Sequence, residues 1–275
     1  MGLQACLSPF EVQRFAMLAR IWDTAITVVD TPGCGDGGIN LTTMQRGALL
    51  RGDFTPVAQH MVAVARRHNP RLSDRPVHLT GYSMGASLAA AAAAAAGPRS
   101  LQLEHLMLIE PVALRRWPLP SLLRSVRLED RLIDGYLADN EAVAGVVPLK
   151  DWQGTDIRCS RLDLALLGFG ISRGGLTRDV LRAAATHQPR VTVVHGVGSR
   201  LSRMTDTSRL IGTCRQAGID IHDVAVEGHH ALWQSLPRVS DLAARAHHLP
   251  RPTPTDENRG PERAVSCSPT AKDGH

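Results

Sequence analysis

The sequence predicts an α/β fold in which a mostly parallel sheet is flanked by helices. Short apolar runs with many β-branched residues alternate with helical patterns, as in parallel strands joined by crossover helices. A Gly-x-Ser-x-Gly motif at 81–85 falls between an expected strand and an expected helix. The chain has 275 residues, 43% of them hydrophobic, which is enough to fill a large core. A mostly disordered or fibrous protein is therefore excluded.

Apolar runs predict five strands, at residues 25–30, 77–80, 106–109, 191–194 and 221–226. A turn-rich stretch, 31–38, follows the first of them. Helices are expected over 55–68 and 84–96. The second helix is nearly all alanine, and side chains this small let a helix lie close against a sheet.

The regular alternation breaks between Ile109 and Val191, where about eighty residues replace the usual single helix. Two stretches of this region carry apolar residues at helical spacing, Leu122, Val126, Ile133 and Leu137 in one and Leu176, Val180 and Ala184 in the other. We therefore expect a helical lid insertion over 111–188. Beyond Pro250 the chain is rich in Pro, Ser, Thr and charge. The expected organisation is one domain over 1–249 and a disordered tail over 250–275.

Charge and cysteine content narrow the class of protein. The formal net charge is +5, but the basic residues are spread along the chain instead of forming one stripe, so no nucleic-acid partner is expected. No apolar run approaches the roughly 18 residues of a membrane span, and the first residues do not resemble a secretory signal. Five scattered cysteines fit a reducing cytoplasm and give neither disulfide nor zinc spacing. Neither a metal nor a cofactor is expected.

The motif Gly81-Tyr82-Ser83-Met84-Gly85 has a specific chemical meaning in its strand–turn–helix context. A serine on such a turn projects its hydroxyl group at the amino end of the following helix. There the helix dipole and the backbone N–H of Met84 can stabilise a developing oxyanion. Ser83 is thus the candidate nucleophile, with Met84 as the oxyanion donor.

At these positions the sequence resembles the α/β-hydrolase family, over roughly residues 10–245. The matching segments, in order, are 29–35 (after the family's fourth strand), 81–85 (its nucleophile elbow), 108–111 (end of the sixth strand), 194–196 (end of the seventh) and 227–230 (the histidine segment). The resemblance implies hydrolysis of an ester, thioester or similar acyl bond through an acyl-serine intermediate. It implies a small-molecule acyl substrate and no cofactor.

The resemblance also implies a base and an acid for the serine. The family histidine usually follows the glycine directly, so His229 is expected to be the base, with His230 as the alternative. Ser199 occupies the place of the family's aspartate after the seventh strand. Glu110, at the end of the sixth strand, is therefore the expected acid, with Asp206, a Ser–His dyad or no catalysis as alternatives.

The amino-terminal part departs from the family pattern. Counting back from Asp30 places the family's His-Gly-type turn near 4–6, so its third strand is expected before Met1. Without that strand, either 25–30 pairs directly with 77–80, or a partner chain such as a second copy fills the gap, or the true start lies upstream. This departure and Ser199 motivate a second hypothesis, a catalytically inactive binding or interaction module.

Overall fold

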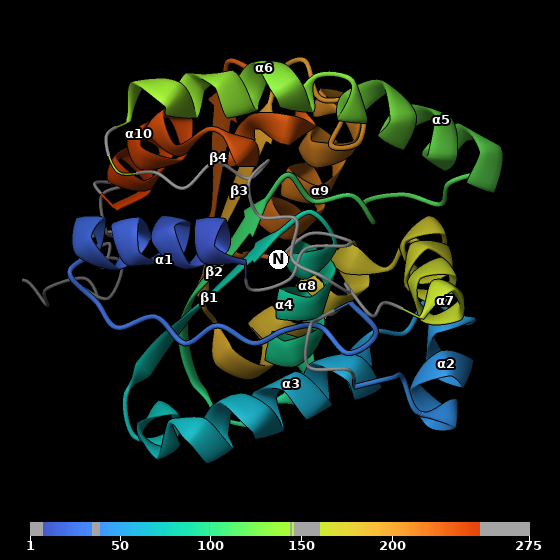
Figure 1. The fold of residues 1–275 in the computed structure, drawn as a ribbon. Coiled ribbons are helices and arrows are strands. Elements are labelled where there is room, and N and C mark those ends of the chain that lie inside the picture. Colours follow the sequence, from blue (N-terminus) through green and yellow to red (C-terminus); the bar gives the residue numbers. More distant parts are fainter. Residues whose placement is uncertain (1–7, 35–38, 99, 144, 146–159, 248–275) are drawn as a thin grey trace, which may run out of the picture.

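The computed structural model describes residues 8–34, 39–98, 100–143, 145 and 160–247. The described residues form one four-stranded sheet whose strands are all parallel (Figure 1). In spatial order these are β1 (Pro76–Tyr82), β2 (Gln102–Ile109), β3 (Arg190–Gly196) and β4 (Ile221–Val226). Four expected strands and the parallel sheet are therefore confirmed. The expected tail at 250–275 lies outside the described residues.

Helices cover both faces of the sheet (Figure 1). One face is covered by α3 (Thr55–His68), α4 (Met84–Ala95), α8 (Leu176–His187) and α9 (Met204–Gln216). The other face is covered by α1 (Pro9–Ile21), by α10 (Leu236–His247) and by the short 3-10 helix η4 (His230–Gln234). Helix α2 (Thr43–Leu49) lies farther out, and the 3-10 turn η1 (Pro70–Ser73) precedes β1. The predicted helices at 55–68 and 84–96 correspond to α3 and α4.

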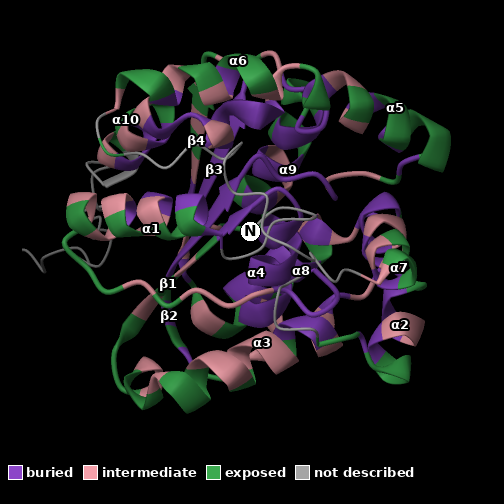
Figure 2. Ribbon diagram, in the orientation of Figure 1, coloured by how far each residue is buried: buried purple, intermediate pink, exposed green. Residues whose placement is uncertain are grey.

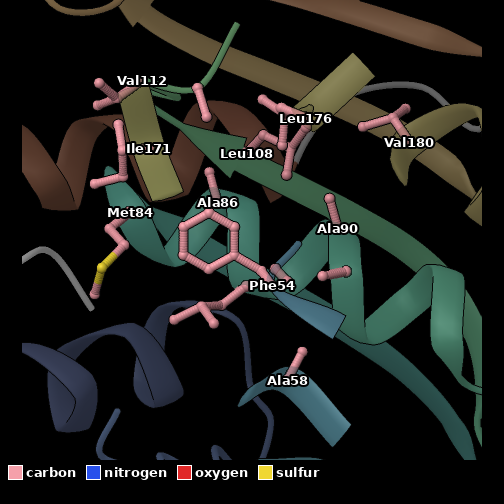
Figure 3. Close-up of a cluster of buried hydrophobic side chains, with 14 of the residues drawn as sticks. Phe54, Ala58, Met84, Ala86, Ala90, Leu108, Val112, Ile171, Leu176 and Val180 are labelled. Atoms are coloured by element: carbon pink, nitrogen blue, oxygen red, sulfur yellow. The ribbon is translucent and has the colours of Figure 1, made fainter. Parts of the chain in front are cut away.

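The core follows the alternation of side chains along the strands. On β2, Leu106 and Leu108 face the α4 side, whereas Met107 and Ile109 face the α1 side. The central strands β2 and β3 are buried on both faces over most of their length, whereas β1 and β4 are partly exposed (Figure 2). The alanines of α4 let α3 and α8 approach it closely, and Figure 3 shows Ala86 and Ala90 among larger apolar side chains. The close packing of α4 fixes the position of Ser83, which lies between the carboxyl end of β1 and the start of α4.

The expected strand at 25–30 is wrong, because these residues form no strand in the structure. The segment links α1 to α2 as an irregular loop (Figure 1). Among the described residues no strand pairs with the outer side of β1. A cavity of about 490 Å³ lies there, lined by β1, residues 24–29 and the inner sides of α1, α3 and α4. A β-rich sequence needs a hydrogen-bonded neighbour to become a strand, and the loop lies across the cavity from its nearest candidate.

The chain between β2 and β3 contains α5 (Leu119–Asp130), α6 (Ile133–Ala138), the 3-10 turn η2 (Asp139–Ala142), α7 (Arg161–Ser172) and α8. Helix α8 buries the expected face of Leu176, Val180 and Ala184 and packs against α4. Helices α5 and α6 instead contact η4. Whether this segment acts as a lid stays a prediction. None of the described helices is long and apolar enough to cross a membrane.

Candidate active site

Ser83 occupies the tight turn between β1 and α4. Its backbone has φ 57° and ψ −120°, an unusual conformation for a residue with a side chain, and its N–H donates to the Ile109 carbonyl at 2.9 Å. The turn requires Gly81, because a Cβ there would lie 2.1 Å from the carbonyl oxygen of Gly85. Met84 begins α4 directly after the serine, so its N–H is one of the free donors of the helix's first turn.

The serine hydroxyl is hydrogen-bonded to a histidine ring. Nε2 of His230 lies 2.9 Å from Ser83 Oγ, and Nδ1 of the same ring lies 3.0 Å from Glu110 Oε2. An ionised carboxylate only accepts hydrogen bonds, so Nδ1 carries the proton and Nε2 is the free acceptor facing the hydroxyl. All three residues are buried. The structure thus brings the expected Ser83 and Glu110 together through one imidazole.

Glu110 follows β2 with a left-handed backbone, φ 49°. Its carboxylate accepts hydrogen bonds from the Gly196 N–H and, at 2.6 Å, from the Ser199 hydroxyl group. With His230 this gives three donors to a fully buried carboxylate, which offsets the cost of removing the charge from water. Ser199, at the position where the sequence lacks an acid, therefore contacts the carboxylate that comes from the neighbouring strand.

His229 was expected to be the base beside Ser83, but the structure places His230 there instead. The ring of His229 turns toward the loop after β3, where Nδ1 lies 2.9 Å from the Gly198 carbonyl. The same loop is hydrogen-bonded to the chain before His229, because the Gly198 N–H donates to the Gly228 carbonyl at 2.9 Å. Neighbouring side chains on extended backbone point in opposite directions, so fixing His229 on this loop turns His230 toward the serine.

His230 is also held by Tyr82. The Tyr82 hydroxyl donates to the His230 carbonyl at 2.9 Å, and the two rings stack with centroids 5.3 Å apart. The ring of Trp233 also stacks with that of Tyr82, with centroids 5.3 Å apart. Burial, together with the Glu110 charge, raises the pKa of Tyr82 well above its usual range. The phenol therefore keeps its proton and remains a donor at any physiological pH.

The other sequence candidates lie elsewhere or outside the described residues. Asp206, the alternative acid, pairs with Arg115 at 3.2 Å and Arg209 at 3.5 Å and makes no described contact with His230. The His-Gly-type turn expected near 4–6 lies outside the described residues. No cluster of metal-binding side chains occurs among the residues that the structure describes.

Comparison with known proteins identifies the fold. No protein-family model and no curated protein sequence matches this chain. A solved structure of N-formylmaleamic acid deformylase Nfo(S94A) from Pseudomonas putida S16 is similar, with a TM-score of 0.54 and 17% sequence identity over 85% of this chain and 86% of that chain. The chain has the α/β-hydrolase fold.

Two further structures resemble this α/β-hydrolase-fold chain at lower scores. The esterase EaEST from Exiguobacterium antarcticum has a TM-score of 0.48 and 13% identity over 85% of each chain. The thioesterase domain from the curacin biosynthetic pathway has a TM-score of 0.44 and 20% identity over 78% of this chain and 79% of that chain.

The α/β-hydrolase fold places Ser83 and Glu110 at neighbouring strand ends. Two contacts of the site were not predicted from the sequence. Nothing in the pair His229-His230 tells which ring faces the serine, because that depends on bonds to Gly198 and Gly228. The role of Ser199 as a donor to Glu110 was also missed. The signal for it was present, since Ser199 occupies the place of the family's acid and Glu110 was the expected replacement for that acid.

Proposed function

We propose that the protein is a serine hydrolase that cleaves an ester, thioester or similar acyl bond of a small molecule through an acyl-Ser83 intermediate. The observation that carries this proposal is the unbroken hydrogen-bonded chain Ser83–His230–Glu110 at the turn before α4. A nucleophile, a base and a group that orients the base are the three parts that activate a serine. The turn itself serves as the nucleophile elbow.

In the first half-reaction, Ser83 Oγ attacks the carbonyl carbon of the substrate while His230 Nε2 takes the hydroxyl proton. The negative charge that develops on the substrate oxygen is stabilised by the Met84 N–H and the amino end of α4. The tetrahedral intermediate collapses as His230 returns its proton to the departing alcohol or thiol. The carbonyl carbon is then bonded to Ser83 Oγ.

In the second half-reaction, His230 Nε2 takes a proton from a water molecule, whose oxygen attacks the acyl carbon. Collapse of that intermediate breaks the bond to Ser83 Oγ, and the proton on His230 passes to the serine. The products are a free carboxylic acid and the original enzyme. Throughout, Glu110 holds the Nδ1–H of His230 and stabilises the imidazolium.

We also propose that the insertion at 111–188 covers this site. Support comes from α5 and α6, which contact η4, the element that begins with His230. A covering of this kind would exclude bulk water and strengthen the electrostatic interactions inside the site.

The test is steady-state hydrolysis of a p-nitrophenyl ester by the purified chain and by two serine variants. Ser83→Ala should abolish turnover. Ser87→Ala is the matched control, because Ser87 lies one turn further along α4, is buried, and its hydroxyl has no hydrogen-bond partner among the residues that the structure describes. It should keep parental turnover. Equal activity of parent and Ser83→Ala would overturn the proposal and favour a binding or interaction module.

A further inference from the structure

Two residues of the insertion bind the backbone of the histidine segment. The buried carboxylate of Glu129, on α5, accepts the His230 N–H at Oε2 over 3.1 Å and the Arg200 N–H at Oε1 over 2.6 Å. The hydroxyl oxygen of Tyr136, on α6, accepts the His229 N–H at 2.7 Å. The N–H groups on both sides of the His229 Cα are thus both hydrogen-bonded to side chains of the insertion.

The Glu129 carboxylate joins two separate loops. Arg200 directly follows Ser199, which donates to Glu110, and His230 bonds both Glu110 and Ser83. One carboxylate therefore sets the distance between the loop that supports the acid and the loop that carries the base. Glu129 has an exposed fraction of only 2%. Burying a carboxylate costs free energy, and the two peptide N–H donors offset that cost in this arrangement.

Asn140 strengthens the same connection further along the chain. Its side-chain amide donates to the Gln234 carbonyl at 2.8 Å, and its oxygen accepts the Leu236 N–H at 2.7 Å. The insertion thus holds the histidine segment at both ends of η4. A displacement of α5, α6 and η2 would release all of these bonds together.

We propose that Glu129 and Tyr136 are positioning residues that set the His230 ring between Ser83 and Glu110, so that packing of α5 and α6 is a condition for catalysis. This inference rests on the proposed hydrolase function. Neither side chain contacts the serine hydroxyl or the Glu110 carboxylate in the described contacts. Their effect acts through the backbone of the base.

The test is the kinetics of Glu129→Gln with a p-nitrophenyl ester, well below the melting temperature. A Gln amide offers one acceptor oxygen where the carboxylate offers two, so one peptide N–H loses its partner. A displacement of the base on the order of 1 Å lowers kcat strongly. We expect kcat to fall about 10- to 100-fold, with KM within about two-fold of the parent because substrate contacts are unchanged. Tyr136→Phe should lower kcat in the same way but less.

Asp179→Asn is the matched control. Asp179 is equally buried on α8 of the same insertion, but its described hydrogen bonds go to Arg178. It should lower the melting temperature without lowering kcat. Parental kcat in folded Glu129→Gln would overturn the inference, and if that variant fails to fold, parental kcat in Tyr136→Phe would do so. An inactive parent would instead refute the hydrolase function, and this inference with it.

Discussion

The hydroxyl group of Ser199 donates to the carboxylate of Glu110 at 2.6 Å, joining the loop after β3 to the end of β2. The Ser202 N–H donates to the Ser199 oxygen at 3.0 Å, which leaves the hydroxyl hydrogen for Glu110. Ser199, which occupies the place of the family's aspartate, thus contacts the carboxylate of Glu110. It supplies a hydrogen-bond donor to a carboxylate that enters from the neighbouring strand.

Glu110→Gln should lower kcat by about two to four orders of magnitude, because an amide neither holds the His230 tautomer nor stabilises its charged form. It should also lower the melting temperature, since the Gly196 N–H or the Ser199 hydroxyl loses its acceptor in a fully buried site. Ester hydrolysis and thermal unfolding of the same sample measure both effects. Asp206→Asn, which alters an ion pair with Arg115, should keep parental kcat. Equal kcat values for the two variants would show that Glu110 has no special role.

The two adjacent histidines should behave differently. His230→Ala removes the base and should lower kcat by about three orders of magnitude or more. His229→Ala removes only a ring bonded to the Gly198 carbonyl and should cost less than about ten-fold. Comparison of kcat for the two purified variants tests this assignment. A larger loss in His229→Ala would show that the ring order at this segment is reversed.

Local patterns were sufficient to predict the four strands of the sheet and the helices α3 and α4. Helix α3 and the strands β2 to β4 combine an apolar pattern with clear turn residues, and each forms where it was predicted. The run at 25–30 has the same local character but no strand beside it. Strand formation depends on a distant hydrogen-bonding partner, which composition does not encode.

For the candidate site too, local patterns predicted some residues and not others. Ser83 and Glu110 were predictable because strand ends in a parallel sheet meet at one edge. The choice of His230 depends on bonds between loops, and Glu129 lies about one hundred residues from that histidine, on a helix whose docking no local pattern predicts. Side-chain direction in loops follows from tertiary contacts.

His105 should make the fold sensitive to acid. Burial, with help from the Arg190 charge, lowers the pKa of His105 to about 3, against an ordinary value of 6.5. Below pH 6.5 the unfolded chain binds a proton that the folded chain refuses until near pH 3, so stability falls as the pH falls through this window. The loss is about 1.4 kcal/mol per pH unit.

Urea unfolding at pH 7 and pH 4.5 measures this effect. His105→Gln should lose less free energy of unfolding between the two pH values than the parent does. If both proteins show the same difference, His105 is not the group responsible.

The open side of β1 should be visible in hydrogen exchange. β3 is paired on both sides, whereas β1 pairs only with β2 among the described strands. Amides of β1 that point away from β2 should exchange much faster than those of β3, because no backbone acceptor protects them. Residue-resolved exchange by NMR, with size-exclusion chromatography of the same sample, measures both. Uniform protection of β1 would mean that another segment or a second copy pairs with its edge.

The central claim is that Ser83 is activated by His230. Incubation with a fluorophosphonate probe, followed by mass-spectrometric mapping of the modified peptide, tests it most directly. One adduct is expected, on Ser83; it should be absent in Ser83→Ala, strongly reduced in His230→Ala and retained in His229→Ala. An adduct on another residue, or equal labelling of the parent and His230→Ala, would contradict it.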